Sequence, residues 1–256
     1  MQILITNDDG IHAPGLVALW TALAPRHQVR VVAPDSEQSA VGHAISLHTP
    51  LRVRRLPGDA GDPWLAVSGT PADCVKIAVA ELLERPPDLV VSGVNRGPNV
   101  GINLLYSGTV SAATEAGILG IPALAVSLDT YEDVDFSLAA QVAARLVDWG
   151  GWRAGPGPAI LNVNVPALPR EAIRGLRWAR QALGAPRERY ERRQDPRANT
   201  YYWLAGEAPP PAEAVSDRAA LAAGYITLTP LRYDLTDEAA LASRLGAAIE
   251  SADLGL

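Results

Sequence analysis

Residues 3–10 read Ile-Leu-Ile-Thr-Asn-Asp-Asp-Gly, an apolar run that stops at two adjacent carboxylates and a glycine. The apolar part has strand propensity, and Asn-Asp-Asp-Gly breaks it. Neighbours in a strand point to opposite faces, so Asp8 and Asp9 reach one point only if the chain turns at Gly10. Two converging carboxylates would form a hard, oxygen-rich site of the kind that magnesium, manganese or calcium prefers. The alternative is a plain turn with solvated charges, and these residues alone leave both readings open.

The composition describes an ordinary globular protein of 256 residues, with 48% hydrophobic and 20% charged residues. The net charge of −6 argues against a nucleic-acid surface, so we expect no nucleic-acid duplex as a partner. Cys74 is the single cysteine, which excludes an intrachain disulfide and a cysteine-based zinc cage. We see no signal peptide and no apolar run of about 18 residues, and we therefore expect a cytoplasmic protein without a membrane partner.

Strand and helix signals alternate through the first 165 residues. The expected strands are residues 3–6, 29–33, 88–93, 122–128 and 160–165, with short hairpin or edge strands within 46–67. The expected helices start at Pro14, after a cap at Thr70, at a cap at Thr109 that leads to Ile118, and at residue 135. This alternation predicts a doubly wound, Rossmann-like α/β fold with a mostly parallel sheet.

The chain changes character after residue 165. Stretches rich in glycine, proline and alanine at 151–158 and 207–213 can act as hinges. The expected elements of this part are an arm with the arginine-dense segment 187–197 and Tyr201-Tyr-Trp, a strand at 225–230 and a helix at 235–252. We therefore expect an α/β catalytic core at 1–165 and, within one structural domain, a β/helical extension at 166–256 that serves oligomerisation.

Three further polar loops stand where a ligand would bind. Residues 35–43 and 92–103 follow predicted strands, whose carboxyl ends carry the ligands of open α/β sheets. The third, residues 106–111, opens a helix whose free amides can bind phosphate. Ordinary surface loops and plain helix capping by Ser107 or Thr109 are the alternatives. The chain has no Walker A motif, no dinucleotide-binding glycine motif and no zinc-type histidine spacing.

Several longer motifs occur together along the chain. They are Thr6-Asn-Asp-Asp-Gly, Ala13-Pro-Gly, Ala33-Pro-Asp, Ser68-Gly-Thr-Pro-Ala-Asp-Cys-Val, Pro87-Asp-Leu-Val-Val-Ser-Gly-Val-Asn-Arg-Gly-Pro-Asn-Val-Gly, Tyr106-Ser-Gly-Thr-Val-Ser-Ala-Ala-Thr-Glu-Ala, Gly120-Ile-Pro-Ala-Leu-Ala-Val-Ser and Gly224-Tyr-Ile-Thr-Leu-Thr-Pro-Leu. With them the chain resembles the stationary-phase survival protein SurE family of 5′-nucleotidases. The resemblance is specific through residue 128 and weaker across 150–223. Thr227 stands where serine is expected, and Ala40-Val-Gly-His falls in a variable loop, departures that concern oligomer contacts and substrate preference.

The resemblance implies a metal-dependent phosphomonoesterase that hydrolyses nucleoside 5′-monophosphates, with 3′-monophosphates as a further option, by metal-activated water. It implies one divalent cation per subunit, Mg²⁺ or Mn²⁺. The implied metal ligands are Asp8, Asp9, Ser39 and Asn95, of which Asp8, Asp9 and Asn95 also serve catalysis. The expected substrate and phosphate contacts are Asn7, Gly42, His43, Asn99, Ser107, Gly108 and Thr109. The implied assembly is a homodimer or homotetramer with exchanged C-terminal segments.

Two other functions stay open at this point. One keeps the metal but uses an aspartate as the nucleophile, through an aspartyl-phosphate. Asp8 and Asp9 are adjacent rather than separated by one residue, which disfavours that chemistry. The other is a non-catalytic nucleotide-binding sensor, whose metal only anchors the ligand.

Overall fold

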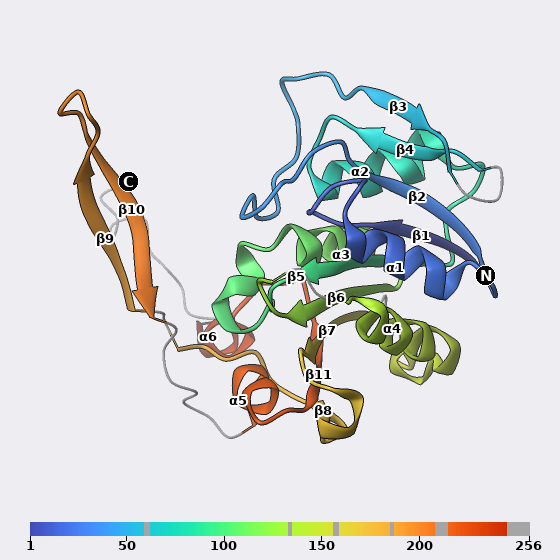
Figure 1. Ribbon diagram of the computed structural model, residues 1–256. Coiled ribbons are helices and arrows are strands. Elements are labelled where there is room, and N and C mark those ends of the chain that lie inside the picture. The colour runs from blue at the N-terminus through green and yellow to red at the C-terminus, as the bar shows by residue number, and fades with distance from the viewer. Residues whose placement is uncertain (59–61, 133–134, 156–158, 185–186, 208–214, 245–256) are drawn as a thin grey trace.

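A computed structural model describes residues 1–58, 62–132, 135–155, 159–184, 187–207 and 215–244. Within them, nine strands form one sheet in the order β3-β4-β2-β1-β5-β6-β7-β11-β8 (Figure 1). Their bounds are β1 Gln2–Thr6, β2 Gln28–Pro34, β3 Val53–Leu56, β4 Trp64–Val67, β5 Leu89–Arg96, β6 Ala123–Asp129, β7 Ile160–Pro166, β8 Leu176–Trp178 and β11 Ile226–Leu231. Strands β4, β2, β1, β5, β6 and β7 pair in parallel, whereas β3 and β11 pair antiparallel with β4 and β7. The mostly parallel, doubly wound α/β sheet predicted from the sequence is thus confirmed.

Helices cover both faces of the sheet, and each face has its own apolar cluster. On one face the core joins α1 (Pro14–Leu23) and α4 (Ser137–Trp149) to the sheet. On the other it joins α2 (Pro71–Ile77), the π-helical turn η2 (Ala78–Leu82) and α3 (Gly108–Ile118). The central strands read as continuous apolar runs because helices bury both of their sides.

The order of the strands reverses between β1 and β5. Strand β1 pairs with β2 on one side and with β5 on the other. The chain builds outward from β1 to β2 and β4, and then returns to place β5 beside β1. Crevices for ligands open at such a switch point, beyond the carboxyl ends of the strands. Asp8 and Asp9 follow β1 at this crevice, and Asn95 lies near the end of β5.

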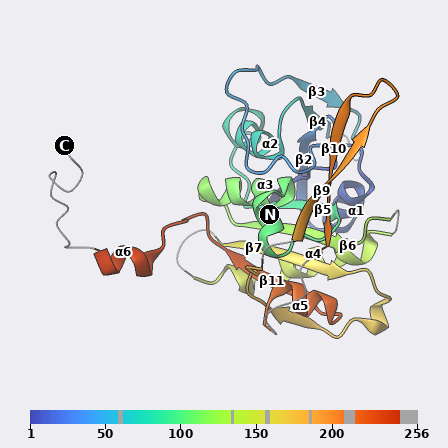
Figure 2. The same cartoon turned by 90° about the vertical axis from the view of Figure 1, so that its left-hand side faces the viewer.

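The second half of the chain contributes both to the sheet and to projecting elements. Strands β8 and β11 complete the sheet, and α5 (Asp217–Ala222) precedes β11. Strands β9 (Arg187–Gln194) and β10 (Thr200–Glu207) form a separate hairpin that stands away from the sheet, which we call the arm (Figure 1). Figure 2 shows α6 (Glu238–Arg244) beyond the body of the molecule. The division of the chain into a catalytic core at 1–165 and an extension at 166–256 stays a prediction.

Two expected helix boundaries differ from the structure. Ser107, not Thr109, caps α3, because the Ser107 hydroxyl accepts the Val110 amide at 3.1 Å. The C-terminal helix starts at Glu238 rather than at residue 235, because the Asp237 carboxylate accepts the amide of Ala240 at 2.9 Å and so caps it. The remainder of the helix expected through residue 252 lies outside the described residues. No described helix is long and apolar enough to cross a membrane.

Candidate metal and phosphate site

Asp8 is buried against the N-terminus of helix α3. It is only 6% exposed, and its Oδ1 accepts a hydrogen bond from the Thr109 hydroxyl. A Cβ on Gly108 would lie 2.7 Å from the Cβ of Asp8, so the helix can approach this closely only because residue 108 is glycine. Burial raises the pKa of Asp8, although hydrogen bonds from Thr109 and Gly108 act against that rise. The positive end of α3 therefore faces a carboxylate that has lost most of its water.

Asp9 shares this environment from the other side of the turn. Its Oδ2 accepts the backbone N–H of Arg96, at the end of β5, at 3.2 Å. Burial, followed by the negative charge of Asp8, raises the pKa of Asp9 to about 6. Two adjacent carboxylates are thus held together at an electrostatic cost, which a bound cation would remove. This pair fits a divalent metal ion.

Asn95 lies near the end of β5, directly before Arg96, whose amide binds Asp9. Its Nδ2 donates to the carbonyls of Gly97 at 2.7 Å and Arg96 at 3.2 Å, which leaves Oδ1 as the free end of the amide. The Gly93–Val94 peptide bond is cis. The pairing of β5 with β6 shifts register between Ser92 and Asn95. This register shift makes β5 irregular just before Asn95.

Ser39 approaches the carboxylates from the loop after β2. Its hydroxyl donates to Oε1 of Glu37 at 2.5 Å, and the neighbouring Gln38 amide donates to the Asp8 carbonyl at 2.8 Å. Asp9, Glu37, Ser39 and Arg96 line one cavity of about 340 Å³. The structure therefore brings Asp9 and Ser39 to the same cavity, with Asp8 beside Asp9 in the chain and Asn95 beside Arg96.

Glu37 and Arg96 were not predicted as site residues. Glu37 adds a second carboxylate, besides that of Asp9, to the lining of this cavity, and its charge also acts to raise the pKa of Asp9. Both residues lie within loops that the sequence singled out, but only the fold shows that they face Asp9. Among the described residues, no three His, Cys, Asp or Glu side chains gather as a metal-ligating group.

His43 contacts Glu115 of helix α3. Its Nε2 lies 2.7 Å from Oε2 of Glu115, whose Oε1 accepts Lys76 Nζ at 2.9 Å. Burial acts to raise the pKa of Glu115, but hydrogen bonds from His43 and Lys76 outweigh it and lower that pKa. The Gly42 amide donates to the carbonyl of Tyr106 at 3.0 Å. These contacts fasten the loop that carries Ser39, and phosphate contacts by Gly42 and His43 stay predictions.

The other predicted phosphate contacts also have partners within the protein. Asn7 Nδ2 donates to the Gly10 carbonyl at 2.9 Å, while its buried Oδ1 has no hydrogen-bond partner among the described residues. The side-chain amide of Asn99 donates to Ser127 Oγ at 2.9 Å. The backbone carbonyl of Asn99 accepts hydrogen bonds from the side-chain amides of Asn162 and Asn164. Ser107 caps α3, and Gly108 and Thr109 hold Asp8. Direct phosphate contacts by Asn7, Asn99, Ser107, Gly108 and Thr109 stay predictions.

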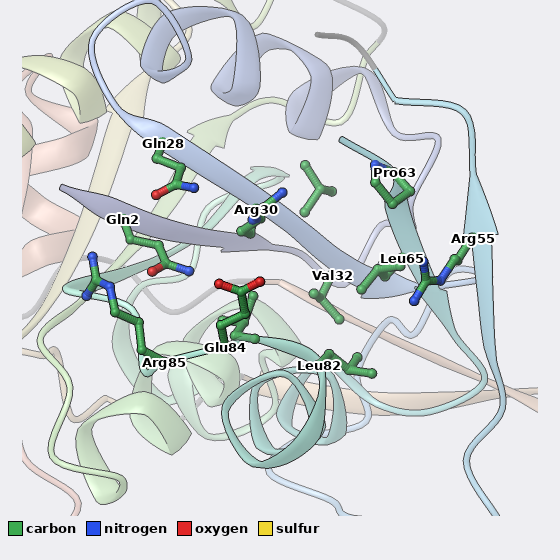
Figure 3. Close-up of a pocket in the computed structure, with 12 residues that line it drawn as sticks. Gln2, Gln28, Arg30, Val32, Arg55, Pro63, Leu65, Leu82, Glu84 and Arg85 are labelled. Atoms are coloured by element: carbon green, nitrogen blue, oxygen red, sulfur yellow. The ribbon is translucent and has the colours of Figure 1, made fainter. Parts of the chain in front are cut away.

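Another cavity, of about 430 Å³, lies at the opposite end of the sheet (Figure 3). Gln2 and Gln28, the first residues of β1 and β2, line it together with Glu84 and Arg85. None of the predicted site residues reaches it. Asp8 and Asp9 lie instead after the carboxyl end of β1, and Asn95 lies near that of β5.

The fold and site define a Rossmann-like α/β protein with a carboxylate pair at its switch point. The family model "Survival protein SurE" matches residues 3–188, and the chain belongs to this family. A protein named 5′-nucleotidase SurE from Syntrophobacter fumaroxidans is 52% identical, over 92% of this chain and 95% of its own. Another of that name, from Nitratidesulfovibrio vulgaris, is 49% identical over 94% of this chain and 90% of its own. The crystal structure of the SurE protein from Aquifex aeolicus superimposes with a TM-score of 0.83 and 41% identity, covering 95% of this chain and 98% of that one.

Proposed function

We propose that this protein is a metal-dependent 5′-nucleotidase, an enzyme that hydrolyses nucleoside 5′-monophosphates to nucleoside and phosphate. Relatives that bear this name match nearly the whole chain at about half identity. The observation that carries the proposal is the Asp8–Asp9 pair, packed against the N-terminus of α3 at the switch point of the sheet. Both features suit a metal-binding phosphatase site, since a cation and a helix N-terminus favour the same anionic substrate.

We infer that one divalent cation, Mg²⁺ or Mn²⁺, is held by Asp8, Asp9, Ser39 and Asn95. All four offer oxygen, which suits a hard cation. The raised pKa values of both aspartates also support a cation here, because its charge would offset theirs. When bound, such a cation neutralises phosphoryl oxygens and makes water a better nucleophile near neutral pH.

The chain's own residues have three tasks in this proposal. Helix α3 fixes Asp8 through Thr109 and directs its positive end toward the phosphate. The Arg96 amide fixes Asp9. The contacts of Gln38 and His43 hold the Ser39 loop against the rest of the site. Orientation of this kind lowers the barrier, because the reacting groups are already in place.

Asp8 is poorly placed to act as a nucleophile. It is nearly fully buried, and one of its oxygens already accepts the Thr109 hydroxyl. We therefore propose that water attacks phosphorus directly and that no aspartyl-phosphate forms. Rapid quench of turnover with a ³²P-labelled substrate should trap no protein-bound phosphate. A phosphate trapped on Asp8 or Asp9 would establish the covalent route instead.

A phosphate-release screen tests the proposed activity. Nucleoside 5′-monophosphates, 3′-monophosphates and a phosphodiester would be compared with Mg²⁺, with Mn²⁺ and without added metal. We expect release from 5′-monophosphates only when a divalent metal is present. The Asp8→Asn variant, purified in the same way, controls for a contaminating phosphatase. Metal-dependent nucleotide binding without phosphate release would instead identify a non-catalytic sensor.

We also propose that the extension at 166–256 mediates a homodimer or homotetramer in the cytoplasm. The arm carries exposed aromatic and apolar side chains, which are frequent in interfaces. They are Tyr190, Tyr202, Trp203 and Leu204. Helix α6, which stands beyond the body of the molecule in Figure 2, is a second candidate for exchange between subunits.

A further inference from the structure

The cavity beside the carboxylates is lined by both polar and apolar residues. Asp9 and Ser39, two of the proposed metal ligands, are among the polar ones. The apolar and aromatic lining residues are Ala13, Pro14, Gly15, Tyr131 and Phe136. A volume of about 340 Å³ lies within the range of small-molecule sites. A molecule that carries both a phosphate and an aromatic ring would match this mixed lining.

The two aromatic residues of this lining have different environments. Phe136 is almost fully buried and belongs to the core formed by α1 and α4. Tyr131, in contrast, is 77% exposed, on the loop between β6 and α4. Phe136 therefore has a packing role that explains it, whereas Tyr131 contributes little to the core.

The Tyr131 ring lies against the backbone of Gly97, two residues beyond Asn95. A Cβ at residue 97 would lie 2.8 Å from Cε1 and 3.3 Å from Cδ1 of this ring. Gly97 has φ +102°, a conformation that also favours glycine. The ring thus sits where a side chain at residue 97 would otherwise stand, and it forms part of the cavity wall next to the end of β5.

We propose that Tyr131 is the stacking platform for the nucleobase of the substrate, an inference that rests on the proposed nucleotidase function. With the phosphate at Asp9 and Ser39, the base can reach the Tyr131 ring, because all three residues line the same cavity. An exposed aromatic ring there can stack on the base. Stacking accepts any base, because every base has a π-face. The subsite therefore favours nucleotides over base-free sugar phosphates, without selecting one base.

Kinetics with two matched substrates test this assignment. AMP and ribose 5-phosphate carry the same phosphoester, but only AMP has a base. We expect Tyr131→Ala to raise KM for AMP about tenfold, with little change in kcat, while KM for ribose 5-phosphate changes less than about twofold. Tyr131→Phe should restore the wild-type KM for AMP, because it keeps the ring. Equal losses on both substrates, or an unchanged KM for AMP, would overturn the assignment.

A binding measurement separates this inference from the proposed activity. Saturation-transfer NMR with adenosine, which has no phosphate, should show contact of the base protons with the wild-type protein and with Tyr131→Phe. The signal should be lost in Tyr131→Ala and kept in Trp149→Ala, which removes an exposed aromatic at the end of α4. An undiminished signal in Tyr131→Ala would refute the stacking role. If adenosine binds through Tyr131 but AMP is not hydrolysed, the proposed function fails and the base subsite stands.

Discussion

At the scale of single residues, the two aspartates of the site differ although they are neighbours in the chain. Asp8 is buried and fixed by the Thr109 hydroxyl, whereas Asp9 faces the cavity and accepts the Arg96 amide. Ser39 offers a neutral hydroxyl on an exposed loop, and this hydroxyl already donates a hydrogen bond to Glu37. The two carboxylates should therefore contribute more to cation binding than the hydroxyl does.

This difference predicts an order among substitutions. Asp8→Asn and Asp9→Asn each remove a charge that faces the cation, and each should reduce Mn²⁺ affinity, measured by calorimetry, more than Ser39→Ala does. Removal of a residue that only orients a metal ligand lowers metal affinity about 10–100-fold, and loss of a charged ligand should reach at least that range. Ser36→Ala, in the same loop but outside the cavity, is the matched control for Ser39→Ala. Undiminished Mn²⁺ binding in both aspartate variants would contradict the ligand assignment.

The raised pKa of Asp9 predicts how metal binding depends on pH. In the metal-free protein this pKa is about 6, above the ordinary value of 3.8. The stability that Asp9 contributes to the folded state is therefore present below pH 3.8 and is lost as the pH rises through about 6. A cation needs the ionised carboxylate, so its affinity should increase over the same interval. The rise in Tm caused by Mn²⁺ should be larger at about pH 7 than at about pH 5, and an equal rise at both would oppose this account.

At the scale of elements, helix α3 positions the site through its first turn. Gly108 permits the approach to Asp8, and Ser107 caps the helix behind it. In Gly108→Ala the new Cβ would overlap Asp8, and we expect a loss of about 1–3 kcal/mol in the free energy of unfolding together with weaker Mn²⁺ binding. Thr114→Ala, farther along the same helix, should leave Mn²⁺ binding unchanged. Wild-type stability and metal affinity in Gly108→Ala would show that the close packing is unimportant.

The elements were largely predictable from sequence because they depend on local patterns. Buried parallel strands such as β5 are continuous apolar runs, and α2 starts at a capping box of Thr70 and Asp73 that is visible in the sequence. The cap of α3 was predicted wrongly, since Ser107 and Thr109 can both cap a helix. The choice between them depends on Asp8, which is 101 residues away in the chain and accepts a hydrogen bond from the Thr109 hydroxyl.

The site was predictable only in part, for the same physical reason. Asp8 and Asp9 come directly after the first predicted strand, where the sequence itself suggests a cation site. The motif resemblance added Ser39 and Asn95, which lies near the end of β5. The cavity is also lined by Glu37, Arg96 and Tyr131, which come from separate segments of the chain. The hydrophobic periodicity of the sequence does not indicate that these segments meet.

At the scale of the whole molecule, the arm and α6 have few partners within the described chain. The arm forms its own two-stranded sheet, and its aromatic side chains are exposed. Deletion of residues 235–256 should therefore lower the mass measured by light scattering, because it removes a segment proposed for exchange between subunits. Residues 1–128 should stay folded, as circular dichroism and thermal unfolding would show. A monodisperse monomer of the intact protein at micromolar concentration would disprove the proposed assembly.

The central claim is that Asp8 and Asp9 hold a divalent cation that is required for phosphate release. The most direct test is phosphate release from a nucleoside 5′-monophosphate by exhaustively chelated protein, before and after Mg²⁺ or Mn²⁺ is returned. We predict no release from the chelated protein, recovery on adding either metal, and no recovery in Asp9→Asn. Full activity in the chelated wild-type protein would contradict the claim.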